Sequence, residues 1–201
     1  MYGLPQTTEV KKQLPKKSIY AKFDLKTSQR DSFDKDVARI DIVGLVSPKT
    51  VPALSPGENV KEFYILAVQL KSKEYDIKNI ALLTKLIPQK MVLALQFEDQ
   101  TQLAIYHTKL ISSKWEQDDN IKLNFSGLNL DTVWDNIVKG IGEIEVEEGK
   151  NLTEQIVANE QRDKLLAQIA TLERKMASEK QPRKKREYFE QIKNLKKKQC
   201  Q

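Results

Sequence analysis

The chain has 201 residues, enough for one domain of ordinary size with its own hydrophobic core and for an appendage. It contains one cysteine, Cys200, and one histidine, His107, which excludes a disulfide framework and zinc sites built from several Cys or His side chains. No segment approaches the roughly 18 consecutive apolar residues that a membrane span needs, and residues 1–17 lack the apolar centre of a signal peptide. We therefore expect a cytoplasmic protein without a membrane segment, with Cys200 as an exposed thiol.

The net charge of +6 is distributed unevenly along the chain. Residues 174–198 contain eleven Lys or Arg and three Glu, a net charge of +8, and residues 1–20 contain four Lys and one Glu, a net charge of +3. The segment between them therefore carries a net charge of −5. Two basic ends on an acidic body indicate that a polyanion or an acidic protein binds at the ends.

The basic N-terminal segment, residues 1–20, is interrupted by Pro5 and Pro15, which exclude a continuous helix. It is predicted to form an extended arm with two pairs of lysines, Lys11 with Lys12 and Lys16 with Lys17. Two interpretations stay open. Either the arm presents a basic strip to a nucleic acid or a partner, or it is a solvated segment docked on its own domain.

The central part of the chain has the only pattern that demands full burial. Phe63–Leu70 is apolar on both faces of a period-2 strand, and so is Met91–Phe97, which is typical of central strands. Between them, Asp76 can cap a helix whose apolar stripe is predicted to consist of Ile77, Ile80, Leu83 and Ile87. The order strand, helix, strand predicts a parallel pair joined by a right-handed crossover.

The other elements of the predicted globular domain, residues 21–149, flank this unit. We expect a short helix over Ser28–Val37 and a strand over Arg39–Ile42, followed by a proline-rich loop of about a dozen residues where a partner could bind. Beyond the central unit the pattern predicts further strands and one helix: a hairpin strand at Gln102–Thr108, a strand pair at Leu110–Trp115 and Ile121–Phe125, and a helix capped by Asp131 that ends near Gly142.

Residues 150–201 follow an acidic linker and have a different pattern. Apolar side chains recur at the 4-3-4 spacing of a coiled coil in two segments: Leu165, Ile169, Leu172 and Met176, then Tyr188, Ile192 and Leu195. Pro182 favours a reversal between the segments, because Pro is accepted at the first helical position but costs about 3 kcal/mol inside a helix. An antiparallel helical hairpin is predicted, with one kinked helix as the alternative. Neither helix has enough apolar residues to be stable alone, so the pair must pack on itself, on the body or on another protein.

One group of residues points to catalysis. Asp41, Gln69 and Lys71 have the spacing of a metal-dependent nuclease signature on two adjacent strands, in which carboxylates hold Mg²⁺ and the lysine stabilises charge. An amide is a poor ligand for this hard cation, and only one carboxylate is in place. An active Mg²⁺ site, a decayed nuclease-like core and an ordinary polar strand end are the three interpretations. No glycine motif for a nucleotide is present, and a single His107 does not favour a Ser/His/Asp triad.

The strongest functional signal is the basic cluster of the predicted hairpin. It consists of seven cations: Arg183, Lys184, Lys185 and Arg186 at the reversal, and Lys196, Lys197 and Lys198 further on. Clustered cations neutralise phosphates with release of counterions, which produces salt-dependent binding without sequence preference. A charged coiled-coil surface is the alternative, but such a surface usually pairs its charges at i, i+4, and few Glu are available here.

Several stretches together are similar to a known family along nearly the whole chain. They are MYGLPQTTEVKKQLPKKSIY, VQLKSKEYD, LIPQK, LNFSGLNLDTVWDNIV and LERKMASEKQPRKKREYFEQIKNLKKK. The chain resembles a bacterial and archaeal family of domains of unknown function. The resemblance implies that members are encoded beside helicases and DNA methyltransferases in restriction or phage-defence clusters, and it supplies no catalytic residue.

These observations predict an α/β fold with a mixed sheet of about five or six strands, two covering helices and a C-terminal antiparallel helical hairpin. The leading hypothesis is a non-enzymatic accessory subunit of a DNA-processing defence assembly, without a cofactor. Its basic ends would bind nucleic acid, with DNA favoured, or a helicase or methyltransferase partner. The second hypothesis is a Mg²⁺-dependent nuclease, and the third is an oligomerisation or docking protein that acts through residues 151–201.

Overall fold

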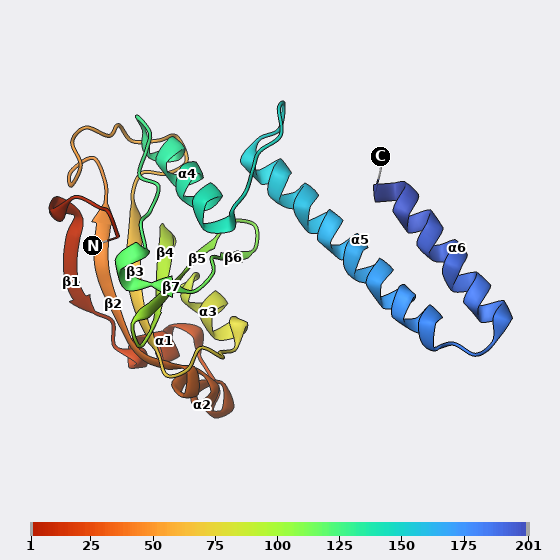
Figure 1. The fold of residues 1–201 in the computed structure, drawn as a ribbon. Helices are drawn as coiled ribbons and strands as arrows, with labels where there is room; N and C mark the ends of the chain where they lie inside the picture. Colours follow the sequence, from red (N-terminus) through yellow and green to blue (C-terminus); the bar gives the residue numbers. More distant parts are fainter. Residues whose placement is uncertain (1, 200–201) are drawn as a thin grey trace. The chain divides into compact units, whose positions relative to one another are not determined.

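The computed structural model describes residues 2–199, except for the side chains of Lys198 and Gln199. Cys200, for which an exposed thiol is expected, lies outside this range. The chain divides into two compact units, Met1–Glu145 and Val146–Gln201, which are described separately (Figure 1). The first unit contains a mixed sheet covered by helices, and the second is a pair of long helices that pack together. The predicted α/β fold with a C-terminal hairpin is confirmed.

The sheet of the first unit has seven strands in the order β1-β2-β3-β4-β5-β6, and β7 pairs with β5 beside β6. The strands are β1 (Glu9–Gln13), β2 (Val37–Val46), β3 (Phe63–Leu70), β4 (Lys90–Phe97), β5 (Gln100–Tyr106), β6 (Leu110–Ser112) and β7 (Glu116–Gln117). Every pair is antiparallel except β3 with β4, which run parallel at the centre of the sheet. The predicted parallel pair is therefore confirmed.

Helix α3 (Ile77–Leu83) connects the two parallel strands, and its first turn is capped as predicted. The Asp76 carboxylate accepts a hydrogen bond from the Lys78 backbone N–H at 2.9 Å. Ile80 and Leu83 are fully buried, but Ile77 is 61% exposed, so its predicted place in the buried stripe is wrong. Ile77 is the first residue of a helix of only seven residues, and its buried positions begin at Asn79.

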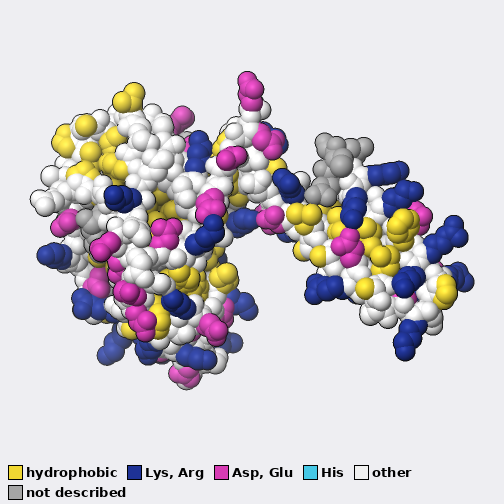
Figure 2. Space-filling view, viewed as in Figure 1, with side chains coloured by type: hydrophobic (Ala, Val, Ile, Leu, Met, Phe, Trp, Pro, Cys, Tyr) yellow, Lys and Arg dark blue, Asp and Glu magenta, His cyan; other side chains and the backbone are white. Residues whose placement is uncertain are grey.

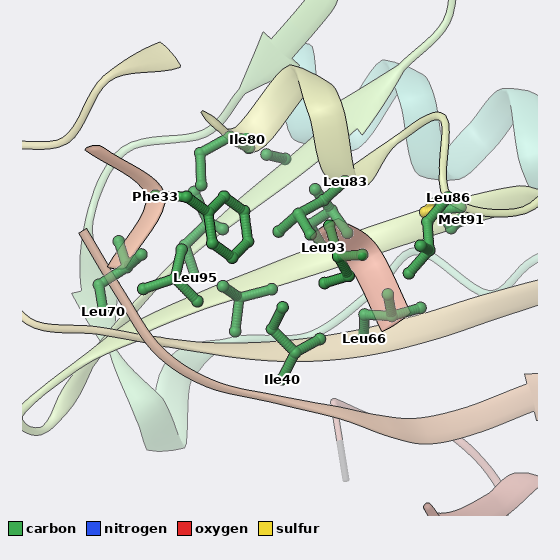
Figure 3. Close-up of a cluster of buried hydrophobic side chains, with 14 residues drawn as sticks. Phe33, Ile40, Leu66, Leu70, Ile80, Leu83, Leu86, Met91, Leu93 and Leu95 are labelled. Carbon is green, nitrogen blue, oxygen red and sulfur yellow. The ribbon is translucent and has the colours of Figure 1, made fainter. Parts of the chain in front are cut away.

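Helices cover both faces of the sheet (Figure 1). On one face, α1 (Lys16–Phe23), α2 (Thr27–Asp36) and α3 close over side chains of the central strands, including Leu66 of β3 and Leu93 of β4 (Figure 3). On the other face, α4 (Leu130–Gly142) buries Trp134, whose ring packs edge-on against Phe63 of β3 with centroids 5.5 Å apart. Because neighbouring residues of β3 point to opposite faces, both of its faces must be apolar.

Residues 121–125 of the first unit differ from the sequence prediction. Residues 121–125 were predicted as a strand but follow the 3₁₀ turn η2 (Asp118–Asn120) without joining the sheet. Their alternating side chains Ile121 and Leu123 are buried, and the Leu123 N–H donates to the Tyr2 carbonyl at 3.0 Å. An alternating pattern indicates that every second side chain is buried. Here, within the part of the chain that the structure describes, that burial occurs without backbone hydrogen bonds to a neighbouring strand of the sheet.

The N-terminal segment lies against the body of the first unit. Its strand β1 pairs with β2, preceded by the 3₁₀ turn η1 (Gln6–Thr8), and the segment continues into α1, where Ile19 is fully buried. Pro15 is the N-terminal flanking residue of α1, a position at which proline is compatible with a helix start. The segment is therefore docked on its own domain, and residues 16–20, predicted as part of an extended arm, belong to a helix.

The proline-rich loop between β2 and β3 is fastened to the start of α4. Asp131 accepts hydrogen bonds from three consecutive backbone N–H groups, those of Glu58 (2.7 Å), Asn59 (3.2 Å) and Val60 (2.7 Å). A Cβ atom on Gly57 would lie 2.3 Å from the Asp131 carboxylate, so only glycine fits there. We call these three hydrogen bonds the Asp131 clamp. The predicted capping role of Asp131 is wrong, since the Asn129 side chain caps α4 by accepting from Thr132 N.

The second unit is an antiparallel pair of helices, α5 (Leu152–Ser178) and α6 (Pro182–Gln199). Helix α5 opens with reciprocal hydrogen bonds of 2.9 Å between Asn151 and Glu154, a capping box. At 1.5 Å per residue, α5 is about 40 Å long. The reversal before Pro182 agrees with the prediction. Ile169 and Ile192 are the buried members of the predicted apolar seam, and the other five members are partly exposed.

Candidate nucleic-acid interface

The first four cations of the basic cluster lie at the start of α6, immediately after the reversal of the hairpin. Arg183, Lys184, Lys185 and Arg186 are all exposed, and the Arg183 side chain keeps 93% of its accessible surface. Arg183 forms a long ion pair of 3.5 Å with Glu187. Within residues 2–199 the other three cations form no ion pair. The hairpin surface therefore shows several Lys and Arg side chains with few acidic neighbours (Figure 2).

The position of these four cations opposes the stability of the helix that carries them. The first turn of an α-helix is the positive end of its dipole, where acidic residues stabilise by roughly 0.3–1 kcal/mol each and cations are correspondingly unfavourable. Helices α4 and α5 follow the rule with Asp131 and Glu154 in their first turns, whereas α6 has no acidic residue there. A helix built for stability alone would not begin in this way, so the cluster favours a role in binding an anion.

The remaining predicted cations of the hairpin differ in their environments. Lys196 forms a 3.0 Å ion pair with Glu173 and thereby links α6 to α5. Lys197 is exposed, and the side chain of Lys198 lies outside the part of the chain that the structure describes. Lys196 is therefore partly engaged in holding the hairpin together, while Lys197 extends the basic surface.

The four predicted lysines of the N-terminal segment lie on the first unit. Lys11 and Lys12 are exposed on β1, at the edge of the sheet, and Lys17 is exposed in the first turn of α1. Lys16 instead pairs with Asp34 at 2.6 Å. Lysines on an edge strand also discourage pairing with other strands, so these residues have a structural explanation that the α6 cluster lacks.

The residues of the nuclease signature lie on or next to the paired strands β2 and β3, and two of them are engaged with other residues. The Asp41 carboxylate accepts two hydrogen bonds from Arg39, at 2.7 and 2.9 Å, and lies opposite Ala67 of β3. Gln69 is exposed opposite Arg39. The Lys71 ammonium donates to the Asp34 carbonyl at 2.6 Å. Among the described residues, no group of three His, Cys, Asp or Glu is arranged to hold a metal ion.

Lys71 and Lys16 belong to a polar cluster that fastens α1 to α2. Asp34 also accepts a 2.5 Å hydrogen bond from the Tyr20 hydroxyl, and the Arg30 guanidinium lies over the Tyr20 ring. Partial burial raises the pKa of Asp34, but the hydrogen bonds from Lys16 and Tyr20 outweigh it and leave the pKa below its usual value. Burial and the bond to Asp34 raise the pKa of Tyr20. The cluster is fully explained as a structural contact.

His107 follows β5, with Lys90 and Asp135 as charged neighbours. Burial and the nearby Lys90 lower the pKa of His107, and burial raises the pKa of Asp135. At neutral pH the imidazole is therefore uncharged, and it adds nothing to the basic surface.

The reversal of the hairpin contains a hollow that was not predicted. Its volume is about 430 Å³, and it is lined by residues of both helices and of the turn: Lys175, Ser178, Glu179, Lys180, Gln181 and Tyr188. Tyr188 lies beside a run of cations in the sequence, but we assigned its side chain to the apolar seam. The hollow could not be predicted, because the residues of α5 that face Tyr188 depend on how the two helices align across the turn.

The chain belongs to the family described as DUF4391, a domain of unknown function, which matches residues 2–198. The predicted membership in a family of this kind is confirmed along nearly the whole length. No curated protein and no solved structure matches the chain. None of the helices within residues 2–199 is both long enough and apolar enough to cross a membrane.

Proposed function

We propose that this protein is a non-enzymatic nucleic-acid-binding subunit whose helical hairpin contacts the phosphate backbone. The observation that carries the proposal is the turn Arg183–Arg186, four consecutive exposed cations at a helix N-terminus, of which only Arg183 forms an ion pair within residues 2–199. Neither the helix dipole nor ion pairing accounts for them. Phosphates would supply the missing negative charge, and binding would release counterions from the nucleic acid.

The setting of this activity follows from the family resemblance. Members of a family encoded beside helicases and DNA methyltransferases are expected to act in a restriction or phage-defence assembly. DNA is therefore the favoured polyanion, and a helicase or methyltransferase subunit is the favoured protein partner. The nuclease hypothesis is less favoured, because Asp41 and Lys71 are each engaged with other residues of the fold.

Binding of the full chain to a mixed-sequence duplex, followed by fluorescence anisotropy between about 50 and 200 mM salt, tests the proposal. Each neutralised phosphate contributes about −0.9 to the slope of log K against log salt, so four contacts predict a slope of about −3.6. Duplexes of different sequence should bind alike. An absence of binding at the lowest salt, or a slope near zero, would contradict the proposal.

A groove along the hairpin favours self-association as a second candidate. It has a volume of about 610 Å³ and is lined only by uncharged side chains of the two helices: Ala167, Gln168, Thr171, Leu172, Gln191, Asn194 and Leu195. A surface that meets a copy of itself must be self-complementary. Amides, which donate and accept, and apolar groups satisfy this condition, whereas the cations elsewhere on the hairpin would repel their copies.

Light scattering of the full chain as a function of concentration tests this candidate. If a second copy occupies the groove, the mass should double, and Ala167→Glu should return it to that of a monomer, because the substitution places a carboxylate at the groove. Ala170 is also exposed on α5 but does not line the groove, so Ala170→Glu is the matched control. A monomeric mass for the unchanged protein at all concentrations would exclude this role.

A further inference from the structure

The hollow at the reversal of the hairpin has a composition that does not suit a simple anion. Lys175 and Lys180 line it, but so does Glu179. The Glu179 carboxylate accepts hydrogen bonds from the backbone N–H groups of Gln181 and Lys180, both at 2.9 Å. The bond from Gln181 is the main reason that the pKa of Glu179 lies below its usual value. A fixed negative charge in the hollow would repel a phosphate placed there.

The same hollow offers groups that suit a nucleobase. Tyr188 contributes an aromatic ring, on which any base can stack. The Glu179 carboxylate can accept from the exocyclic amine of a base, as carboxylates do from cytosine N4. Ser178 and Gln181 add a hydroxyl and an amide that can donate or accept. The hollow has a volume of about 430 Å³ and is wide open to solvent, so a base could enter it from outside.

The phosphate-binding groups lie next to the hollow along the chain. Tyr188 follows Arg186 by two residues on α6, and the charges of Lys184 and Lys185 are close enough to Glu179 to help lower its pKa. A nucleotide with its base in the hollow could therefore place its phosphate on the cations of the first turn. Bases in a duplex are stacked and paired, so only an unpaired base can enter.

We propose that the hairpin tip is a single-stranded nucleic-acid site in which Tyr188 stacks on an unpaired base while Arg183–Arg186 bind the flanking phosphates. This inference rests on the proposed nucleic-acid-binding function and specifies its substrate class. Phe189, which is 54% exposed on the neighbouring helix face, provides a second aromatic surface near the same phosphates. Stacking and phosphate contacts do not depend on the base, so the only sequence preference we expect is for a base whose exocyclic amine can donate to Glu179.

Substitution of Tyr188 tests this proposal without removing the apolar packing of the hairpin. Tyr188→Leu keeps an apolar side chain at this position of the seam but removes the ring, and Tyr188→Phe keeps the ring. We expect Tyr188→Leu to weaken the binding of the full chain to oligodeoxycytidylate about tenfold, because loss of one stacked base typically weakens binding by about 5- to 150-fold. Its affinity for a duplex of equal length should change less than about twofold, and Tyr188→Phe should bind both probes like the unchanged protein.

Tyr106 is an exposed tyrosine of the first unit, so Tyr106→Leu is the matched control and should bind both probes normally. Equal losses for the single strand and the duplex in Tyr188→Leu would show a structural role for Tyr188 and overturn the stacking site. Unchanged binding of the single strand by Tyr188→Leu would also overturn the stacking site. In either case salt-dependent duplex binding would leave the proposed function standing, whereas no binding of either probe by the unchanged protein would remove both.

Discussion

Reversing the charge of the four cations in the first turn of α6 is expected to abolish nucleic-acid binding while leaving the hairpin folded. In the variant Arg183→Glu, Lys184→Glu, Lys185→Glu and Arg186→Glu, four phosphate contacts become four repulsive ones. At roughly 0.1 M salt we expect the affinity to fall by about 100-fold or more, and the slope of log K against log salt to shrink by about 3.6. Fluorescence anisotropy with a labelled duplex and a labelled single strand measures both quantities.

The hairpin should tolerate these substitutions because they lie where acidic residues are favourable. All four side chains are exposed, and only Arg183 forms an ion pair. Glutamates in the first turn of α6 interact favourably with the helix dipole, as Glu154 does in α5. The helical signal in circular dichroism should therefore stay equal or increase. A loss of helicity would mean that the cations stabilise the hairpin directly.

A control with the same change in net charge separates local contact from long-range attraction. Lys35, Lys49, Lys78 and Lys85 are exposed lysines of the first unit for which the structure shows no ion pair among the described residues. Their replacement by glutamate should lower the affinity far less. Equal effects of the two variants would show that overall charge governs binding and would remove the hairpin as the site.

The architecture of the first unit could be predicted where burial leaves one solution. Strands β3 and β4 are apolar on both faces, and in a chain of this size only a central strand of a covered sheet accommodates such a pattern. The pairing of β1 with β2 at the edge of the sheet, and the absence of residues 121–125 from the sheet, could not be predicted in the same way. Both depend on backbone partners, and alternating side chains do not reveal which backbone groups are paired.

The cations of the candidate site could be predicted from the sequence, but the residues that line the hollow beside them could not. Clustered charge is visible in the sequence, and Arg183–Arg186 are exposed as expected. The hollow beside them combines Lys175 of α5 with Tyr188 of α6, which requires the register of the hairpin. Register also decides side-chain partners: the Asp41 carboxylate accepts from Arg39, and the Lys71 ammonium donates to the Asp34 carbonyl, neither of which the sequence spacing indicates.

Removal of the Asp131 carboxylate is expected to destabilise the first unit by about 3 kcal/mol. Hydrogen bonds from backbone N–H groups to a charged acceptor contribute more than neutral ones, about 1.5–3 kcal/mol each. In Asp131→Ala the exposed N–H groups of Glu58 and Asn59 can turn to water, which limits their cost. Val60 is only 3% exposed, so its N–H would lose its acceptor without gaining a full substitute. Asp131→Asn, which keeps one carbonyl oxygen, should lie between.

The effect of Asp131 should depend on pH in a defined direction. Burial raises the pKa of this carboxyl group, but the hydrogen bonds from Asn59, Val60 and Glu58 outweigh it and hold the pKa below the usual 3.8. A carboxyl group whose pKa is lower in the folded than in the unfolded state stabilises the fold above the unfolded pKa. This contribution disappears as the pH falls through the folded pKa. The unchanged protein and Asp131→Asn should therefore differ most at neutral pH and converge as the pH falls through the folded pKa of Asp131, which lies below 3.8.

Thermal unfolding followed by tryptophan fluorescence measures this difference, because both tryptophans, Trp115 and Trp134, belong to the first unit. At neutral pH the loss of about 3 kcal/mol in Asp131→Ala should lower the Tm by roughly 6–12 °C in a unit of this size, and Asp131→Asn should lower it less. Asp119 is exposed and has no hydrogen bond among the described residues, so Asp119→Asn removes the same charge and should leave the Tm nearly unchanged. If Asp131→Asn matched Asp119→Asn at neutral pH, the loop between β2 and β3 would be held by its apolar contacts and the clamp would contribute little.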